Sequence, residues 1–266
     1  MKTNENLKKI VKSKYSLIAK QSNTVSCCST SGCGCEQPDN ILTKNYSGLK
    51  GYVPDADLKL GCGIPTEYAG ISTGDSVLDL GSGAGNDCFV ARALVGETGK
   101  VTGLDFTDEM IRKALNNNEK LGYTNVEFIK GDIEAMPLNN NSFDVIVSNC
   151  VLNLVPDKEK AFSEMYRVLK PGGHFCVSDI VLEGELPPAI KKSAEMYAGC
   201  VAGALQKDYY LGIALKIGFT NIKVHQQFEV PLPDEELRNY LSKEEIEKYK
   251  DSNSGIYSIT VSGYKL

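Results

Sequence analysis

The sequence predicts an α/β protein built on a mostly parallel, seven-stranded sheet with helices on both faces. Between about residues 70 and 180, short apolar runs alternate with stretches of helical periodicity, which is typical of parallel strands joined by helical crossovers. A glycine-rich turn, Asp79 to Gly85, follows the first apolar run. Such a turn between a strand and a helix indicates a cofactor site at the carboxyl edge of the sheet.

Composition argues against several other classes of protein. The 266-residue chain has a net charge of −5, with 24% charged and 42% hydrophobic residues, so it lacks the basic balance of a nucleic-acid-binding protein. No apolar run approaches the roughly 20 residues that cross a membrane, and residues 1–20 do not resemble a signal peptide. Nine cysteines, an odd number, argue against a disulfide scaffold. We expect a cytoplasmic monomer without membrane or nucleic-acid partners.

The elements follow in order along the chain. Residues 5–20 have helical spacing, residues 21–40 form a Cys-rich loop and residues 41–70 are interrupted by Pro and Gly. Strands are predicted at Val77–Leu80, Val101–Leu104, Val126–Ile129, Phe143–Ser148 and His174–Val177, and helices at 87–94, 108–121 and 158–169. The sequence Lys170-Pro171-Gly172-Gly173 is expected to end the last of these helices.

The rhythm changes after residue 180. Helices are predicted at Pro187–Ala204 and Lys207–Ile217, and closing strands at Ile222–Phe228 and Tyr257–Tyr264. We therefore expect three parts: an amino-terminal helix, Cys-rich arm and lead-in (1–68), a cofactor-binding core (69–182), and substrate-site helices with the closing strands (183–266). The middle helices would form a small insertion over the active site.

Three features mark the cofactor site. Gly81 and Gly83 let the backbone turn tightly and approach a ligand, and the helix after them directs amides toward polar groups. Asp105 ends the second strand, where a carboxylate can accept ribose hydroxyls. Asp132 follows the third strand, beside amides that can read an adenine ring. Each acid alone is as well explained by a helix cap or a solvated loop. The glycine turn and the two acids together, at the ends of successive strands, are not explained in that way.

This arrangement resembles the class I S-adenosylmethionine-dependent methyltransferases, whose fold is Rossmann-like. The turn departs from the dinucleotide pattern because Asn86 stands where that pattern has its third Gly or Ala. The resemblance implies S-adenosylmethionine as cofactor. It also implies a cofactor site made by Asp79, Gly81, Ser82, Gly83, Gly85, Asp105, Met110, Asp132, Ile133, Glu134 and Asn149.

The cysteines bear on the acceptor of the methyl group. Cys62 lies between two glycines, Cys150 follows the fourth strand at the cofactor edge, and Cys200 lies beyond the core. Buried packing explains Cys176 and Cys88 better. Converging thiolates suit a soft centre, and trivalent arsenic would present its lone pair to a methyl donor without any need for a base. Zinc would prefer four ligands.

The segments around these cysteines resemble the arsenite methyltransferases. The resemblance implies that Cys62, Cys150 and Cys200 bind arsenite or its thiol conjugate and act in catalysis. It also implies a thiol reductant, thioredoxin or glutathione, with thioredoxin as a partner, and a role in arsenic detoxification. One departure is Leu60, which stands where many members of the family have tyrosine before Gly-Cys-Gly. The sulfonium contact expected of that tyrosine is therefore in question.

Several alternatives stay open. The pairs Cys27-Cys28 and Cys33-Cys35 form a flexible loop, a metalloid-capture or thiol-relay site, or a zinc site with unusual spacing. The acceptor could also be organic, such as a quinone or lipid precursor. A third hypothesis is a non-enzymatic metalloid-binding protein. Structural roles are expected for His174 and His225. Tyr15 is a candidate to cap the methionine end of the cofactor, although core packing explains it equally well.

Overall fold

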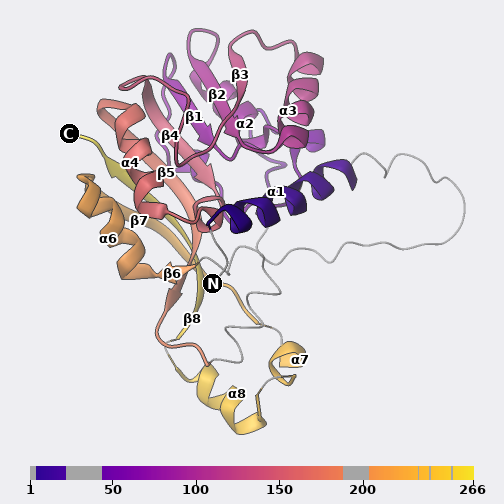
Figure 1. The fold of residues 1–266 in the computed structure, drawn as a ribbon, viewed down its shortest axis with the longest axis vertical. Helices are drawn as coiled ribbons and strands as arrows, with labels where there is room; N and C mark the ends of the chain where they lie inside the picture. The colour runs from indigo at the N-terminus through magenta and orange to yellow at the C-terminus, as the bar shows by residue number, and fades with distance from the viewer. Residues whose placement is uncertain (1–3, 22–43, 188–203, 233, 240, 253) are drawn as a thin grey trace, which may run out of the picture.

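The structure is a computed structural model, and it describes residues 4–21, 44–187, 204–232, 234–239, 241–252 and 254–266. One sheet organises the chain (Figure 1). Seven strands follow the order β3-β2-β1-β4-β5-β8-β7, and the two-residue β6 pairs with β5. The strands are β1 (Ser76–Leu80), β2 (Lys100–Asp105), β3 (Val126–Lys130), β4 (Phe143–Asn149), β5 (Leu169–Glu183), β6 (Leu205–Gln206), β7 (Thr220–Glu229) and β8 (Gly255–Tyr264).

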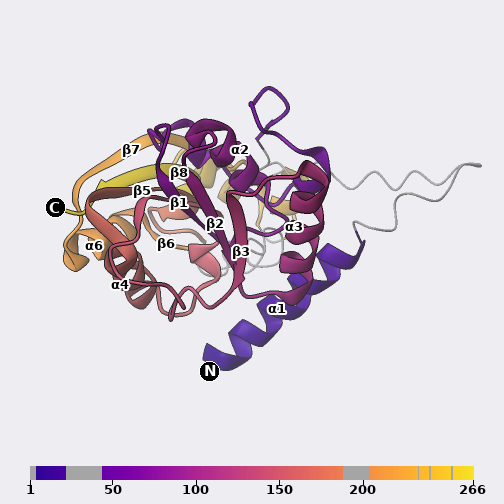
Figure 2. The same cartoon turned by 90° about the horizontal axis from the view of Figure 1, so that it is seen from above.

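The predicted α/β class is confirmed. The first five strands pair in parallel, and only β8 runs antiparallel, to both β5 and β7. Helices cover the two faces: α2 (Asn86–Val95) and α3 (Asp108–Leu121) on one, α4 (Lys158–Val168) and α6 (Lys207–Ile217) on the other (Figure 2). The division of the chain into three parts stays a prediction.

Alternation along the strands explains both cores. Leu78, Leu80 and Phe175 face the layer of α4 and α6, whereas Val77 and Cys176 face α2. Side chains of a strand alternate between the faces of a sheet, so a strand buried on both sides reads as a continuous apolar run. This burial fixes the register of the strands and places their carboxyl ends on one edge.

The expected end of α4 is confirmed to within one residue, because the helix ends at Val168 and Leu169 is extended. The sequence Lys170-Pro171-Gly172-Gly173 after it does not form the expected turn. The four residues lie within β5, between the pairs Phe143–Leu169 and Val145–His174. Between these two pairs, β5 advances by five residues while β4 advances by two. Gly172 adopts φ +81° in this irregularity. Gly and Pro therefore form a bulge here, directly after the end of the helix.

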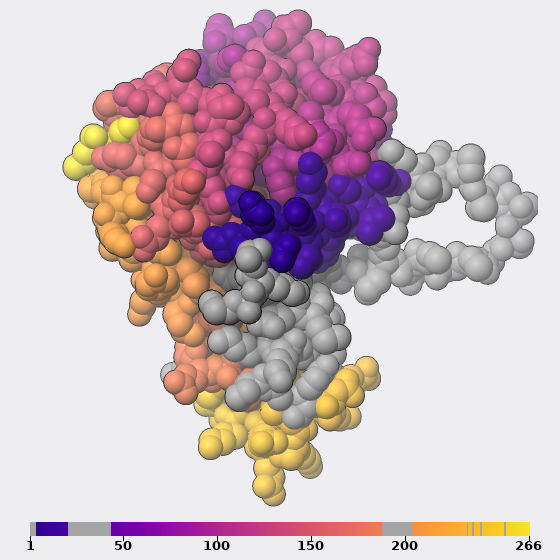
Figure 3. Space-filling model, viewed as in Figure 1, coloured from indigo at the N-terminus to yellow at the C-terminus, as the bar shows by residue number. Residues whose placement is uncertain are grey.

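The amino-terminal helix α1 (Asn4–Gln21) was expected to be amphipathic, but most of its apolar side chains are not buried. Leu7, Ile10 and Leu17 are 39%, 49% and 58% exposed. The helix packs against α3 and lies across the front of the core (Figure 3).

The remaining elements are short. They are the 3-10 turns η1 (Pro54–Ala56), η2 (Pro65–Glu67) and η3 (Leu152–Leu154), and the helices α7 (Asp234–Leu237) and α8 (Lys243–Lys250). The predicted helix over Pro187–Ala204 falls almost wholly outside the described residues. No helix in the described part of the chain is long and apolar enough to cross a bilayer.

Candidate active site

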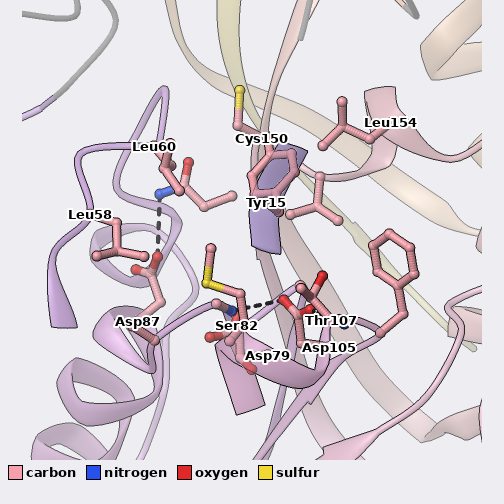
Figure 4. Close-up of a pocket in the computed structure, with 18 of the residues that line it drawn as sticks. Tyr15, Leu58, Leu60, Asp79, Ser82, Asp87, Asp105, Thr107, Cys150 and Leu154 are labelled. Atoms are coloured by element: carbon pink, nitrogen blue, oxygen red, sulfur yellow. Dashed lines mark hydrogen bonds between the residues drawn. The ribbon is translucent and has the colours of Figure 1, made fainter. Parts of the chain in front are cut away.

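A pocket opens at the carboxyl edge of the sheet, where the loops after β1, β2, β3 and β4 meet (Figure 4). It encloses about 1160 Å³, its open mouth included. Most of the predicted cofactor residues line it, namely Asp79, Gly81, Ser82, Gly83, Asp105, Met110, Asp132, Ile133 and Asn149. Gly85 and Glu134 do not. The sheet topology thus brings together side chains from four separate strand ends, as expected for ligand sites in parallel sheets.

The two glycines of the turn do different work. Both have positive φ, +69° at Gly81 and +52° at Gly83, a region that favours glycine. A Cβ on Gly81 would lie 2.4 Å from Val151 Cγ2, so this position is needed for packing. A Cβ on Gly83 would meet nothing closer than Met110 Sδ at 4.0 Å. Gly83 therefore leaves space for a ligand, not for a neighbouring side chain.

Asp105 is held rigidly at the end of β2. Its Oδ2 accepts the Gly83 N–H at 3.0 Å and its Oδ1 accepts the Thr107 N–H at 2.8 Å. Burial raises its pKa, and these backbone donors oppose that shift. The Thr107 hydroxyl and the Phe106 N–H also contact this carboxylate, and an acid at this strand end is suited to accept hydroxyl groups of a sugar.

Two buried polar atoms of residues that line the pocket lack partners. Ser82 Oγ and Asn86 Oδ1 are buried and make no hydrogen bond to any described residue. Leaving a buried polar atom unsatisfied costs about 1–3 kcal/mol, so such atoms commonly mark where a ligand binds. Together with the open space at Gly83, they show that the residues present fit an adenosyl cofactor.

The acids after β3 are shared with α1. Lys8 Nζ lies 2.5 Å from Asp132 Oδ2 and also forms a salt bridge with Glu134. The other Glu134 oxygen accepts the Asp157 N–H at 2.8 Å. Glu134, a predicted cofactor residue, is thus placed to join α1 to the loop after β4. Gly85 precedes α2, where a Cβ would lie 2.9 Å from the ring atoms of Phe89 and Phe128; its role there is packing.

The helix α1 contributes more residues to the pocket than its sequence pattern indicates. Lys8, Val11 and Tyr15 line the pocket, and Tyr15 is seen in Figure 4; of the three, the sequence pattern indicates only Tyr15. The helix is attached by further ionic contacts, including Lys12 to Asp108 at 2.9 Å. No local pattern indicates that a helix separated by more than 50 residues from the first strand closes the site.

The floor of the pocket is acidic. Asp79 and Asp87 are 2% and 8% exposed, and the Cys88 thiol donates to Asp79 Oδ2 at 3.2 Å. Burial raises the pKa of Asp79 well above its usual value, and the neighbouring Asp87 raises it further. Burial likewise raises the pKa of Asp87 to about 6. Cys88, expected to be simple packing, therefore also provides a hydrogen bond to a pocket acid.

Two of the three predicted arsenic ligands lie together. Cys62 and Cys150 are 1% and 2% exposed and pack in one apolar cluster with Ile180 and Leu182. Cys150 has φ +60°, uncommon for a residue with a side chain, and donates its N–H to Ser178 O at 2.8 Å. In Figure 4, Cys150 lies across the pocket from Ser82 and Asp105.

The other predicted thiols are not described. Cys200 lies outside the described residues, as do Cys27, Cys28, Cys33 and Cys35. Within the described ranges, no three His, Cys, Asp or Glu side chains gather in a way that would hold a metal ion. Cys176 lies fully buried in the α2-side core, as expected.

Both histidines make structural contacts, in line with their expected roles. His174 Nε2 contacts the Ala69 carbonyl, and its ring stacks on Tyr264 with centroids 4.9 Å apart. His225 Nε2 bonds to Ser262 Oγ at 2.8 Å. Neither lines the pocket.

Known proteins of similar sequence and structure agree on one family. A methyltransferase-domain model matches residues 71–227. An arsenite methyltransferase from Halobacterium salinarum is 44% identical over 169 residues, which make up 64% of this chain and 43% of that protein. A ubiquinone/menaquinone biosynthesis C-methyltransferase from Klebsiella pneumoniae is 42% identical over 112 residues, 42% of this chain and 45% of that protein.

A solved structure extends this comparison. The crystal structure of an arsenic(III) S-adenosylmethionine methyltransferase from Chlamydomonas reinhardtii has a TM-score of 0.65 and 39% identity, covering 77% of this chain and 68% of that chain. The chain spans about half the length of the curated relatives it matches. On the family model and this structure, the chain belongs to the S-adenosylmethionine-dependent methyltransferases and, among them, to the arsenite methyltransferase family.

Proposed function

We propose that this protein transfers a methyl group from S-adenosylmethionine to arsenite, the reaction for which the similar arsenite methyltransferases are named. One observation carries the proposal. Cys62 and Cys150 are buried in one cluster, on loops that meet at the cofactor pocket. Cys150 itself lines that pocket. Two thiols beside a methyl-donor site suit a soft acceptor such as As(III).

Capture of arsenite needs no external base. Each cysteine S–H exchanges with an As–OH group: an As–S bond forms, an As–O bond breaks, and the thiol proton leaves with the hydroxide as water. Cys62 and Cys150 provide two such bonds, and by family resemblance Cys200 provides the third. Three sulfurs leave the arsenic lone pair on the open side, so positioning against the methyl group accounts for most of the catalysis.

The chain's own residues would hold the cofactor. S-adenosylmethionine supplies an electrophilic methyl group on a sulfonium. Asp105 accepts ribose hydroxyls, Asp132 and the Ile133 amide bind the adenine edge, and Ser82 donates or accepts with its unpartnered hydroxyl. Asp87, a carboxylate above about pH 6, places negative charge on the floor, which favours a cationic ligand. Tyr15 and Val11 cover the pocket and exclude water.

Turnover would also require a reductant. Methylation through the lone pair oxidises arsenic from As(III) to As(V), so a thiol reductant such as glutathione or thioredoxin returns it to As(III), and the thiols become a disulfide. In this proposal Cys27, Cys28, Cys33 and Cys35 capture the metalloid or relay the disulfide. A Cys27→Ser and Cys28→Ser double variant then slows turnover without changing S-adenosylmethionine affinity.

The similarity to a quinone-pathway C-methyltransferase favours one competing function. Methylation at carbon requires a base near the methyl group, and the pocket offers carboxylates but neither histidine. The deciding experiment is mass-spectrometric product analysis with S-adenosylmethionine, glutathione and either arsenite or a demethylated quinone. Methylarsenicals support our proposal. A methylated quinone, with arsenite left unchanged, refutes it, and tight arsenite binding without product would indicate a metalloid-binding protein.

A further inference from the structure

Three polar side chains form a buried group behind Cys62. Tyr46, which precedes η1, is 4% exposed, and Asp87, at the start of α2, is 8% exposed. The Tyr46 hydroxyl lies 2.9 Å from Asp87 Oδ1, to which it donates. Asn149, the last residue of β4, donates from Nδ2 to the Tyr46 oxygen at 2.8 Å.

The same Asn149 carboxamide forms hydrogen bonds with the backbone of the Gly61–Gly63 loop. Its Oδ1 accepts the N–H of Cys62 at 3.0 Å and that of Gly63 at 3.3 Å, and its Nδ2 donates to Gly63 O at 2.8 Å. Because oxygen and nitrogen of the amide each have a defined partner, the orientation of the side chain is fixed. The backbone around Cys62 is thus bonded to a single side chain.

The glycines beside Cys62 make this contact possible. A Cβ on Gly61 would lie 2.5 Å from Asn149 Nδ2, and a Cβ on Gly63 would lie 2.4 Å from Ser178 Oγ. Any larger residue would push the loop away from its anchors. The Gly-Cys-Gly sequence therefore fits a loop pressed against β4 and β5 and held at the Cys62 backbone.

We propose that Tyr46, Asp87 and Asn149 are positioning residues that fix the Gly61–Gly63 loop, and through it the Cys62 thiol, for capture of As(III). The Tyr46 hydroxyl donates its hydrogen to Asp87, so the group is complete when Asp87 is a carboxylate. A protonated Asp87 would need an acceptor of its own. The Tyr46 hydroxyl, 3.1 Å from Gly63 O, would then compete with Asn149 for that carbonyl. The arsenic part of this inference rests on the proposed function.

The charges around Asp87 make the group pH-dependent. Burial raises the pKa of Asp87 to about 6, with donation from Tyr46 and Asn149 lowering it and Asp57 raising it. Burial also raises the pKa of Tyr46, so its hydroxyl keeps its proton. The titratable groups facing Asp87 are Tyr46 and Asp57 from the lead-in, Asp79 from β1 and Cys88 from α2. Arsenite affinity should fall as pH drops through about 6.

Amide hydrogen exchange tests the positioning directly, with no arsenic present. In Tyr46→Phe, we expect the Cys62 and Gly63 amides to exchange roughly tenfold faster, as loss of one hydrogen bond would allow. Tyr52→Phe is the matched control, since it removes a Tyr–Asp bond of 3.2 Å to Asp57 in the same segment, and it should leave these amides unchanged. Equal protection of the two amides in both variants overturns the proposal.

Binding measurements separate this inference from the proposed function. In wild-type protein, arsenite affinity should be lost below pH 6, and Asp87→Asn should remove that pH dependence while weakening binding about tenfold. If wild-type protein binds no arsenite at any pH, the proposed function fails, and amide exchange still decides the positioning role. If wild-type protein binds arsenite with the same pH profile as Asp87→Asn, the positioning role of Asp87 fails.

Discussion

Lys8 of α1 lies 2.5 Å from the carboxylate of Asp132, which follows β3. The contact joins residues 124 positions apart in the sequence and fixes the amino-terminal helix over the predicted adenine end of the pocket. The helix that closes the cofactor site is thus attached to the very loop that would bind the adenine.

Removing that attachment should weaken cofactor binding. We expect Lys8→Met to reduce S-adenosylmethionine affinity about two- to fivefold, in the range of a partly exposed ion pair, because α1 would cover the pocket for less of the time. Isothermal titration calorimetry measures it. Lys12→Met, which removes the 2.9 Å contact to Asp108 on the same helix, is the control and should have the smaller effect. An unchanged affinity in Lys8→Met would show that α1 does not act as a cover.

Alanine substitutions of the two turn glycines should have different effects on folding and on cofactor binding. Gly83→Ala places a methyl group in open space at a strained φ of +52°, so it should fold with a loss of about 1–2 kcal/mol and bind S-adenosylmethionine at least tenfold more weakly. Gly81→Ala drives its methyl group into Val151 and should lower the melting temperature more than Gly83→Ala does. Thermal unfolding with and without cofactor distinguishes them. Equal cofactor affinity in Gly83→Ala and wild type would contradict the ligand role of Gly83.

The cysteines can be tested individually. Cys150→Ser should abolish arsenite methylation and leave S-adenosylmethionine affinity intact, because it removes one arsenic ligand and none of the cofactor contacts. Cys176→Ala, fully buried in the core, should keep its turnover number and lose on the order of 1 kcal/mol of stability. Product analysis by mass spectrometry and urea unfolding give the two readouts. Normal methylation in Cys150→Ser would refute the proposal that Cys150 binds arsenic.

Buried acids should make the free energy of unfolding fall as pH rises. Burial raises the pKa of Asp179, on β5, to about 7, and that of Asp87 to about 6. Between about pH 4 and these values the folded protein holds protons that the unfolded chain has lost, so the stabilisation is complete below pH 4 and is lost by about pH 7. Asp87→Asn should flatten this slope and raise stability at pH 8 by on the order of 2 kcal/mol. Urea unfolding at pH 5 and pH 8 measures the pH dependence and the change in stability. The same pH dependence in Asp87→Asn and wild type would contradict the raised pKa of Asp87.

The sequence was sufficient for the sheet and for the strand-end residues. Apolar runs buried on both faces determine β1 to β5, and the parallel topology then brings Gly81, Asp105 and Asp132 to one edge. These signals are local, or depend only on strand order. The turn at Lys170–Gly173 was misjudged because Gly and Pro end helices and form bulges alike, and only pairing with β4 distinguishes the two.

Long-range contacts were beyond local patterns. Nothing in the sequence around Tyr46 or Asp87 indicates that they meet, since residues 41–70 have no clear periodicity and Asp87 looks like an ordinary first-turn acid. The exposed apolar side chains of α1 show the same limit. Helical spacing predicts a helix, but which face it buries depends on ionic contacts with α3 and the loop after β3 that only the folded chain makes.

The Cys62 carbonyl accepts a hydrogen bond of 2.7 Å from Ser258 Oγ on β8, 196 residues later. During synthesis, the first cysteine of the thiol pair leaves the ribosome long before the strand that anchors it. The pocket therefore cannot take its final shape until β8 has emerged. A nascent chain would carry exposed, unorganised thiols, and competence to capture a thiophilic ion would arise in one late folding step.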